Sequence, residues 1–257
     1  MNTARPRALF ISHGAPTLAL EKIPAHDFLI ELGRSLPRPS AVVVVSPHWI
    51  APVFAVKQAE RYRAWHDFGG FPDALNQIRY APPGDPALAA HIAQHLQQAR
   101  IATQLVDDER LDHGVWVPLV LMYPQADVPV INVASLGRGT QAHYKLGRVL
   151  AAAVDDDALI IGSGGAVHNL HEISAPGTRP PPWALGFDDW LADKLLENDR
   201  EALLDYRRQA PDAARAHPTE DHLMPLFVAL GAAHAGAQAL HRSFSYGSLS
   251  MACYAFG

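Results

Sequence analysis

Four short runs of aliphatic and β-branched residues constrain the fold of this chain most strongly. A strand with alternating apolar and polar residues leaves one face in water, whereas a continuously apolar strand is covered on both faces. Segments with helical spacing separate the runs, and Asp85-Pro86 is a typical start for one of them. The alternation predicts an α/β fold whose central sheet is mixed, mostly parallel and flanked by helices. The runs are residues 8–11, 41–45, 128–133 (broken only by Pro129) and 158–161, and the helical segments are 87–99, 144–154, 187–206 and 222–233.

The length of the chain and its even composition favour a single domain. The 257 residues contain no internal repeat, low-complexity tract or linker, so we expect one catalytic domain over residues 1–257. Two long proline-rich segments, 51–86 and 174–183, are predicted to be loops. Long loops inside a compact domain usually carry function.

Charge and hydropathy exclude several classes of partner. The formal net charge is −5 and no basic cluster exceeds two adjacent residues, which argues against nucleic acid or an anionic membrane. No apolar run reaches the length of a membrane span. The single cysteine, Cys253, cannot form an internal disulfide, and the first residues do not resemble a signal peptide. We therefore expect a cytoplasmic monomer or small homo-oligomer.

Histidine placement is the feature that points to chemistry. His13, His48 and His168 each follow one of the apolar runs in a polar turn that contains glycine or proline. Ligands of open α/β sheets bind at the carboxyl ends of the strands, so these imidazoles are predicted to converge on one rim. His113 and His222 stand at two further helix starts. The pattern predicts a metal site, although neutral imidazole suits zinc, iron, copper and nickel alike.

Other motifs are weaker. The Gly162-Ser163-Gly164-Gly165 turn lacks the spacing of phosphate or dinucleotide loops, and it is more typical of a tight turn that lets the chain pass close to a metal or ligand. Ser163 does not stand in the Gly-x-Ser-x-Gly pattern of serine hydrolases. His91 and His95 stand four apart on a helix, a spacing that suits a metal pair but is more typical of a solvated face beside the glutamines around them. His143, His171, His234 and His241 have no motif around them and are predicted to lie at the surface.

At these histidines the sequence resembles the class III extradiol ring-cleavage dioxygenases, in the branch that contains DOPA 4,5-dioxygenase. The resemblance runs along nearly the whole chain, and several motifs in the right order carry it. They are Leu9-Phe10-Ile11-Ser12-His13-Gly14-Ala15-Pro16, Ser46-Pro47-His48-Trp49, His66-Asp67-Phe68-Gly69-Gly70-Phe71-Pro72, Tyr80-Ala81-Pro82-Pro83-Gly84, Leu111-Asp112-His113-Gly114-Val115-Trp116, Val167-His168-Asn169-Leu170, Trp183-Ala184 with Phe187-Asp188, Pro218-Thr219-Glu220-Asp221-His222, and residues 244–251.

The resemblance implies a non-haem metal centre that opens the ring of a catechol with O2 to give a muconic semialdehyde. The family's metal ligands fall on His13, His48 and His222, where distant relatives use glutamate at the third position. His168 matches an acid/base group or further ligand beside the metal, and His113 matches a second active-site histidine. We expect both to transfer protons with pKa values near neutral. The cofactor is one divalent metal per chain: Fe(II) for activity, or Zn(II) as bound, because an all-imidazole site holds zinc tightly.

Two other functions are compatible with the same histidines. A zinc-dependent hydrolase or lyase would activate water without O2, so an anaerobic assay separates it from a dioxygenase. A non-catalytic binding relative would lack a ligand. Two local roles also stay open: Trp49, Trp116 and Phe71 form either an aromatic pocket wall or core, and Asp112 either orients His113 or caps the following helix.

Overall fold

An eight-stranded mixed sheet forms the centre of the computed structural model, which describes residues 6–257. The strand order is β5-β3-β7-β2-β8-β1-β12-β9. Strands β1, β8, β2 and β7 are consecutive neighbours and run parallel, while β3 and β12 join them antiparallel. The strands of this sheet are β1 (Ala8–Ser12), β2 (Val42–Ile50), β3 (Phe54–Lys57), β5 (Thr103–Val106), β7 (Val130–Ser135), β8 (Leu159–Gly164), β9 (Ala237–His241) and β12 (Cys253–Phe256).

The four predicted apolar runs are the four parallel strands at the centre, which confirms the predicted α/β fold. Their side chains alternate between two separate hydrophobic layers. Phe10 and Val43 pack into one layer, while their neighbours Leu9 and Val44 pack into the other. Every position of the four apolar runs except Pro129 is therefore buried, and this explains the absence of an apolar–polar alternation in the sequence.

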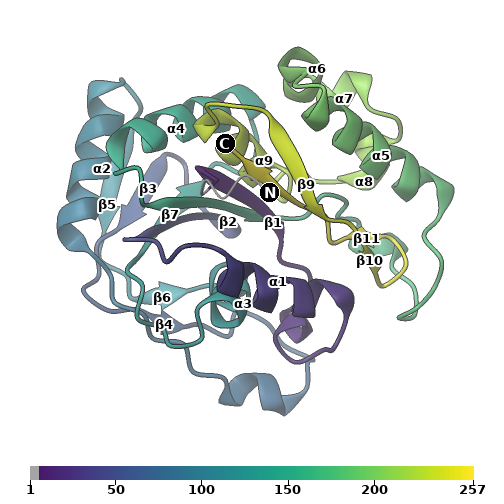
Figure 1. Ribbon diagram of the computed structural model, residues 1–257, viewed down its shortest axis with the longest axis horizontal. Helices are drawn as coiled ribbons and strands as arrows, with labels where there is room; N and C mark the ends of the chain where they lie inside the picture. Colours follow the sequence, from purple (N-terminus) through teal and green to yellow (C-terminus); the bar gives the residue numbers. More distant parts are fainter. Residues whose placement is uncertain (1–5) are drawn as a thin grey trace.

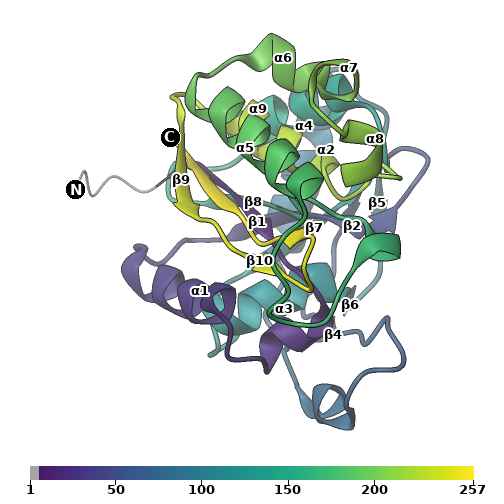
Figure 2. The same ribbon diagram turned by 90° about the vertical axis from the view of Figure 1, so that its right-hand side faces the viewer.

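Helices cover both faces of the sheet (Figures 1 and 2). On one face α4 packs along α9 and α2, while α5 packs against β9 at the edge of the sheet; on the other face α1 packs along α3. Proline begins α2, and Asp85 caps it by accepting a hydrogen bond from the Leu88 amide at 2.9 Å. The helices are α1 (Pro24–Ser35), α2 (Pro86–Gln98), α3 (His113–Met122), α4 (Thr140–Ala153), α5 (Pro182–Leu196), α6 (Arg200–Leu204), α7 (Tyr206–Gln209), α8 (Ala213–Ala216) and α9 (Met224–Ala232).

Two predicted segments differ in the structure. The expected helix over 187–206 is divided into α5, α6 and the start of α7, because Asn198 takes a left-handed conformation (φ 56°) and the Asp199 side chain caps a new helix. The predicted loop 51–86 contains β3 and several short elements. The short elements of the chain are β4 (Arg63–Ala64), β6 (Arg110–Leu111), β10 (Phe244–Ser245), β11 (Leu249–Ser250), η1 (Pro16–Ala19), η2 (Asp73–Gln77) and η3 (Leu170–Glu172).

None of the helices in the described part of the chain combines the length and the apolar character needed to cross a membrane.

Candidate metal centre

The predicted convergence of histidines is confirmed by a cavity of about 220 Å³ at the carboxyl rim of the parallel strands. His13 follows β1, His48 lies near the end of β2, and His168 follows β8. His113 opens α3, and His222 lies just before α9. The cavity is lined by these five histidines together with Gly14, Ala15, Pro16, Phe68, Phe71, Leu170 and Leu249.

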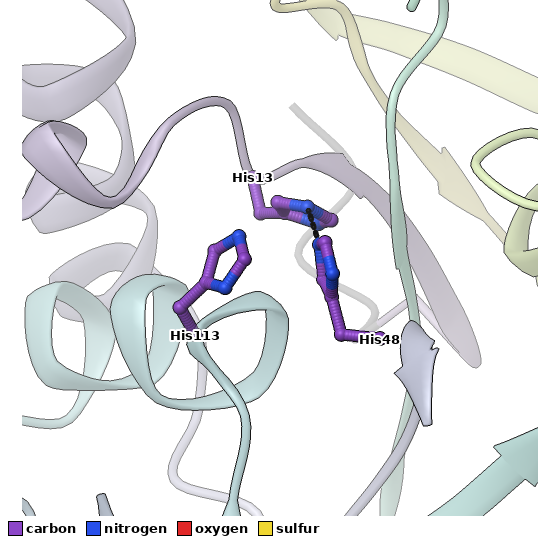
Figure 3. A group of neighbouring side chains, drawn as sticks. All are labelled: His13, His48 and His113. Atoms are coloured by element: carbon purple, nitrogen blue, oxygen red, sulfur yellow. Dashed lines mark hydrogen bonds between the residues drawn. The ribbon is translucent and has the colours of Figure 1, made fainter. Parts of the chain in front are cut away.

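A hydrogen-bond chain fixes the tautomer of His13. The Ser163 hydroxyl donates to the Gly114 carbonyl, so its oxygen accepts from His13 Nδ1 at 3.0 Å. Nδ1 therefore carries the proton, and Nε2 of neutral His13 presents its lone pair to the cavity. This atom lies 3.1 Å from Nε2 of His48 (Figure 3). Two imidazole nitrogens turned toward one another in this way suit a shared proton or a shared cation.

His222 presents a buried nitrogen that has no partner. Asp221 Oδ1 accepts from the backbone amide of His222 at 2.8 Å and from its Nδ1 at 3.0 Å. The other ring nitrogen, Nε2, is buried and makes no hydrogen bond. Because buried polar atoms are rarely left unpaired, this lone pair is suited to a ligand such as a metal ion. The ring of His168 stacks on His222 with centroids 3.5 Å apart and planes 4° from parallel.

His113 is held by an aspartate that lies 46 residues earlier in the chain. Asp67 Oδ1 accepts from the His113 backbone amide and from its Nδ1, each at 3.0 Å. Asp112 stands at the N-cap position of α3, as one of its two predicted roles requires, but its side chain makes no capping bond. The side chain accepts from the Ser46 hydroxyl at 2.6 Å instead, and Asp67 takes the predicted role of orienting His113.

Two groupings of three imidazoles are present around the cavity. Ring nitrogens of His13, His48 and His113 all lie within 4.8 Å of one another (Figure 3). His222 completes a second grouping, with its ring centroid 5.5 Å from that of His13 and 5.0 Å from that of His48. His13 and His48 are common to both, with centroids 5.1 Å apart.

Burial and mutual repulsion keep His13, His48 and His168 neutral. Desolvation, followed by the neighbouring histidines, lowers the pKa of His48 and of His168 to about 2. The same causes lower the pKa of His13 well below its ordinary value. The expected near-neutral pKa of His168 is therefore wrong for the metal-free protein. Neutral imidazoles offer the lone pairs that a metal requires.

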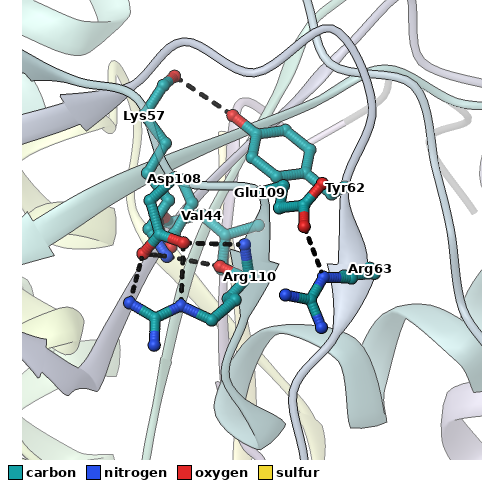
Figure 4. A network of polar contacts seen from close by, with 8 residues as sticks. Val44, Lys57, Tyr62, Arg63, Asp108, Glu109 and Arg110 are labelled. Atoms are coloured by element: carbon teal, nitrogen blue, oxygen red, sulfur yellow. Dashed lines mark hydrogen bonds and ion pairs between the residues drawn. The ribbon is translucent and has the colours of Figure 1, made fainter.

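Apart from the five histidines, the lining of the cavity is apolar. Phe71 lines the cavity, which agrees with its predicted role as an aromatic pocket wall. Phe68 packs edge-on against Phe71, with ring centroids 5.4 Å apart. Trp116 is fully buried behind this wall and packs on Phe68, so its role is core packing. Trp49 belongs neither to the cavity wall nor to the core. The Lys57 ammonium lies over its ring, with Nζ 4.6 Å from the ring centroid. Lys57 pairs with Asp108 at 3.2 Å, in a polar network that does not line the cavity (Figure 4).

The remaining histidines lie outside the cavity. His91, His171 and His234 are exposed, as predicted, and His95 is half-buried beside His91. The predicted surface position of His143 is wrong, since this residue is fully buried between the Gly139 carbonyl and the Ser135 hydroxyl. His241 is also half-buried, stacked on a phenylalanine.

Sequence reasoning assigned no role to three residues that shape the site: Asp67, Asp221 and Phe68. Asp221 directly precedes His222, and Asp67 and Phe68 stand in the same motif as Phe71. A carboxylate close to a histidine in the sequence is the signal that could identify such a partner. For His113 it favours Asp112, the adjacent residue, whereas the partner in the structure is Asp67.

Comparisons with known proteins agree with this geometry. The family model of the catalytic LigB subunit of aromatic ring-opening dioxygenase matches residues 7–257. A 4,5-DOPA dioxygenase extradiol of Beta vulgaris is 39% identical over 255 residues, covering 96% of this chain and 95% of that protein. A protein of the same name from Escherichia coli K12 is 36% identical, with coverage of 90% and 87%.

The fold is also similar to a solved structure. An uncharacterized protein from Escherichia coli K12 superposes with a TM-score of 0.81 at 31% identity, and the match covers 98% of this chain and 100% of that one.

Proposed function

The chain belongs to the family of the catalytic LigB subunit of aromatic ring-opening dioxygenases, and on this premise we propose that its cavity opens the ring of a catechol such as DOPA, using Fe(II). The enzyme is an extradiol dioxygenase, an oxidoreductase that acts on a small aromatic substrate with O2 through a non-haem metal site. The ligand set, the metal, the catechol and the product, a muconic semialdehyde, belong to the proposal.

His13, His48 and His222 are the proposed metal ligands. The observation that carries this choice is the Nε2 atom of His222, which is buried beside the other two rings and has no hydrogen-bond partner. A bound imidazole has its centroid roughly 3.2 Å from the ion when the bond is about 2.1 Å, so two ligands at a tetrahedral angle have centroids about 5 Å apart. The three centroid distances of this set, 5.1, 5.5 and 5.0 Å, fit that expectation.

His113 and His168 are the proposed proton-transfer groups. The centroid of His113 lies only 3.9 Å from that of His48, which is too close for two ligands spread around one ion. The ring of His168 is nearly parallel to that of His222. Lone pairs in parallel ring planes do not meet at one point, so the stacking favours an acid/base role over that of a fourth ligand.

The division of labour follows from these positions. When bound, Fe(II) supplies the electron transfer between ring and O2 that opening of the ring requires. Neutral His168 and the ring nitrogen of His113 that faces away from Asp67 accept protons from the catechol hydroxyls and return them as the ring opens. Phe68 and Phe71 pack the substrate ring and keep water away.

Metal removal gives the direct test of this function. Protein stripped with a chelator and reloaded with Fe(II) is expected to consume O2 and produce a yellow product from DOPA or a simpler catechol. Protein reloaded with Zn(II) is expected to do neither, because zinc has no accessible second oxidation state. The measurement is O2 uptake together with visible absorbance.

An anaerobic control separates this function from a zinc-dependent hydrolase or lyase. Turnover that continues without O2, or that zinc supports as well as iron, would contradict the proposal. The assay uses a broad panel of catechols, because the choice of DOPA rests on the names of the similar proteins.

A further inference from the structure

One carboxylate oxygen controls both the position and the proton of His113. Asp67 Oδ1 accepts from the His113 backbone amide and from Nδ1, each at 3.0 Å. The Asp67 side chain is 8% exposed, and among the described residues its one ion pair is with His113. The backbone amide can only donate, so Asp67 Oδ1 is an acceptor, and as an acceptor it takes its second hydrogen bond from Nδ1. Nδ1 therefore carries a proton, and Nε2 of neutral His113 keeps its lone pair.

The segment that carries Asp67 is attached to the first turn of α3 at three points. Besides the Asp67 bonds, the Trp116 indole donates to the Trp65 carbonyl at 3.0 Å. Phe68 packs edge-on against the His113 ring with centroids 5.8 Å apart. Residues 65–71 thus hold His113 in place and also supply Phe68 and Phe71 to the cavity wall.

A second aspartate repeats this arrangement on the other side of the cavity. Asp221 Oδ1 accepts from the amide and Nδ1 of His222, as Asp67 Oδ1 does for His113. The two pairs differ in their surroundings. His222 Nε2 is buried and unpartnered beside His13 and His48, whereas the His113 ring lies against Phe68 at the substrate wall. Similar hydrogen bonds therefore prepare two imidazoles for different tasks.

We propose that Asp67 is a positioning residue of the ring-opening reaction: it holds His113 in the Nδ1–H tautomer, with Nε2 directed to a substrate hydroxyl. This rests on the proposed function, in which His113 transfers a proton and does not bind the metal. Asp67 acts only through His113 and is not itself in the cavity lining. Asp221 does the corresponding work for the metal ligand His222.

Variants at the two aspartates test the assignment as a matched pair. Asp67→Ala is expected to keep the iron content of the wild type and a KM within about twofold of it, while kcat falls about 10–100-fold. Asp221→Ala is expected to lose iron, with a metal affinity about 10–100-fold weaker in competition with a chelator. A purely structural role of Asp67 would loosen the Phe68 wall and raise KM instead.

Asp67→Asn distinguishes hydrogen bonding from charge. The His113 backbone amide can only donate, so it holds the asparagine oxygen where the carboxylate oxygen was. The Nδ1–H tautomer then persists, and this variant is expected to recover most of the kcat lost in Asp67→Ala. An Asn variant no better than Ala would overturn the proposal, as would an Ala variant with wild-type kcat or a change confined to KM.

The metal measurements keep this proposal separable from the proposed function. Wild-type protein that opens no catechol would refute the proposed function. The iron content of Asp67→Ala would still show whether the residue that Asp67 holds, His113, is a metal ligand. Loss of iron in Asp67→Ala would overturn the assignment, because it would make His113 a metal ligand. Thermal unfolding of each variant verifies that it is folded.

Discussion

His222→Ala is expected to yield folded protein that binds Fe(II) at least about 100-fold more weakly than the wild type, a greater loss than removal of a supporting residue brings, and that opens no catechol. His222 Nε2 is the buried lone pair that no other group satisfies, so its removal leaves His13 and His48 as an incomplete site. Iron content and chelator competition measure the affinity.

His113→Ala is the decisive comparison. It is expected to retain iron at the wild-type level while kcat falls about 10²–10⁴-fold, the range for loss of a general acid or base. The exposed histidine His171 supplies the control, since His171→Ala is expected to change neither quantity. If His113→Ala lost iron and His222→Ala kept it, the ion would be held by His13, His48 and His113, and the proposed ligand set would be wrong.

Gly164→Ala is expected to displace His222 without touching any ligand side chain. A Cβ at Gly164 would overlap the His222 carbonyl oxygen, whose hydrogen bond from the Gly165 amide (2.9 Å) fixes this segment against β8. Overpacking of this kind costs about 1–3 kcal/mol, occasionally more. The variant is therefore expected to show a lower unfolding temperature and weaker iron binding together.

Gly186→Ala is the matched control, because a Cβ at that position in α5 meets no atom within 4 Å. Alanine favours a helix interior over glycine by about 1 kcal/mol, so this variant is expected to be slightly more stable with unchanged iron binding. Normal iron binding in Gly164→Ala would show that the approach of His222 to β8 does not set the ligand position.

The strands and the imidazoles that follow them could be predicted from sequence because each is determined locally. Burial of both strand faces produces the continuous apolar runs, and parallel strands place their carboxyl ends at one rim. Gly164 makes the close approach predicted for the glycine turn, but the backbone of His222 lies against it and not the predicted metal or ligand. The glycine is recognisable in the sequence, but the segment that packs against it is not.

The parts that sequence reasoning missed depend on single contacts and single backbone conformations that follow no periodic pattern. Asp67 reaches His113 across 46 residues that include α2 and β5, with no periodicity that relates the two. The break at Asn198 depends on one left-handed residue inside an otherwise helical pattern. His143 is buried because Gly139 and Ser135, four and eight residues before it, satisfy its two ring nitrogens, and no sequence pattern predicts these contacts.

A crystal structure of the iron-loaded protein, with anomalous diffraction measured at the iron absorption edge, tests the central claim most directly. We expect a single anomalous peak in the cavity, about 2.1 Å from a ring nitrogen of each of His13, His48 and His222, with His113 held by Asp67 and not bonded to the ion. A peak bonded to His113 in place of His222, or no peak among these imidazoles, would contradict the account.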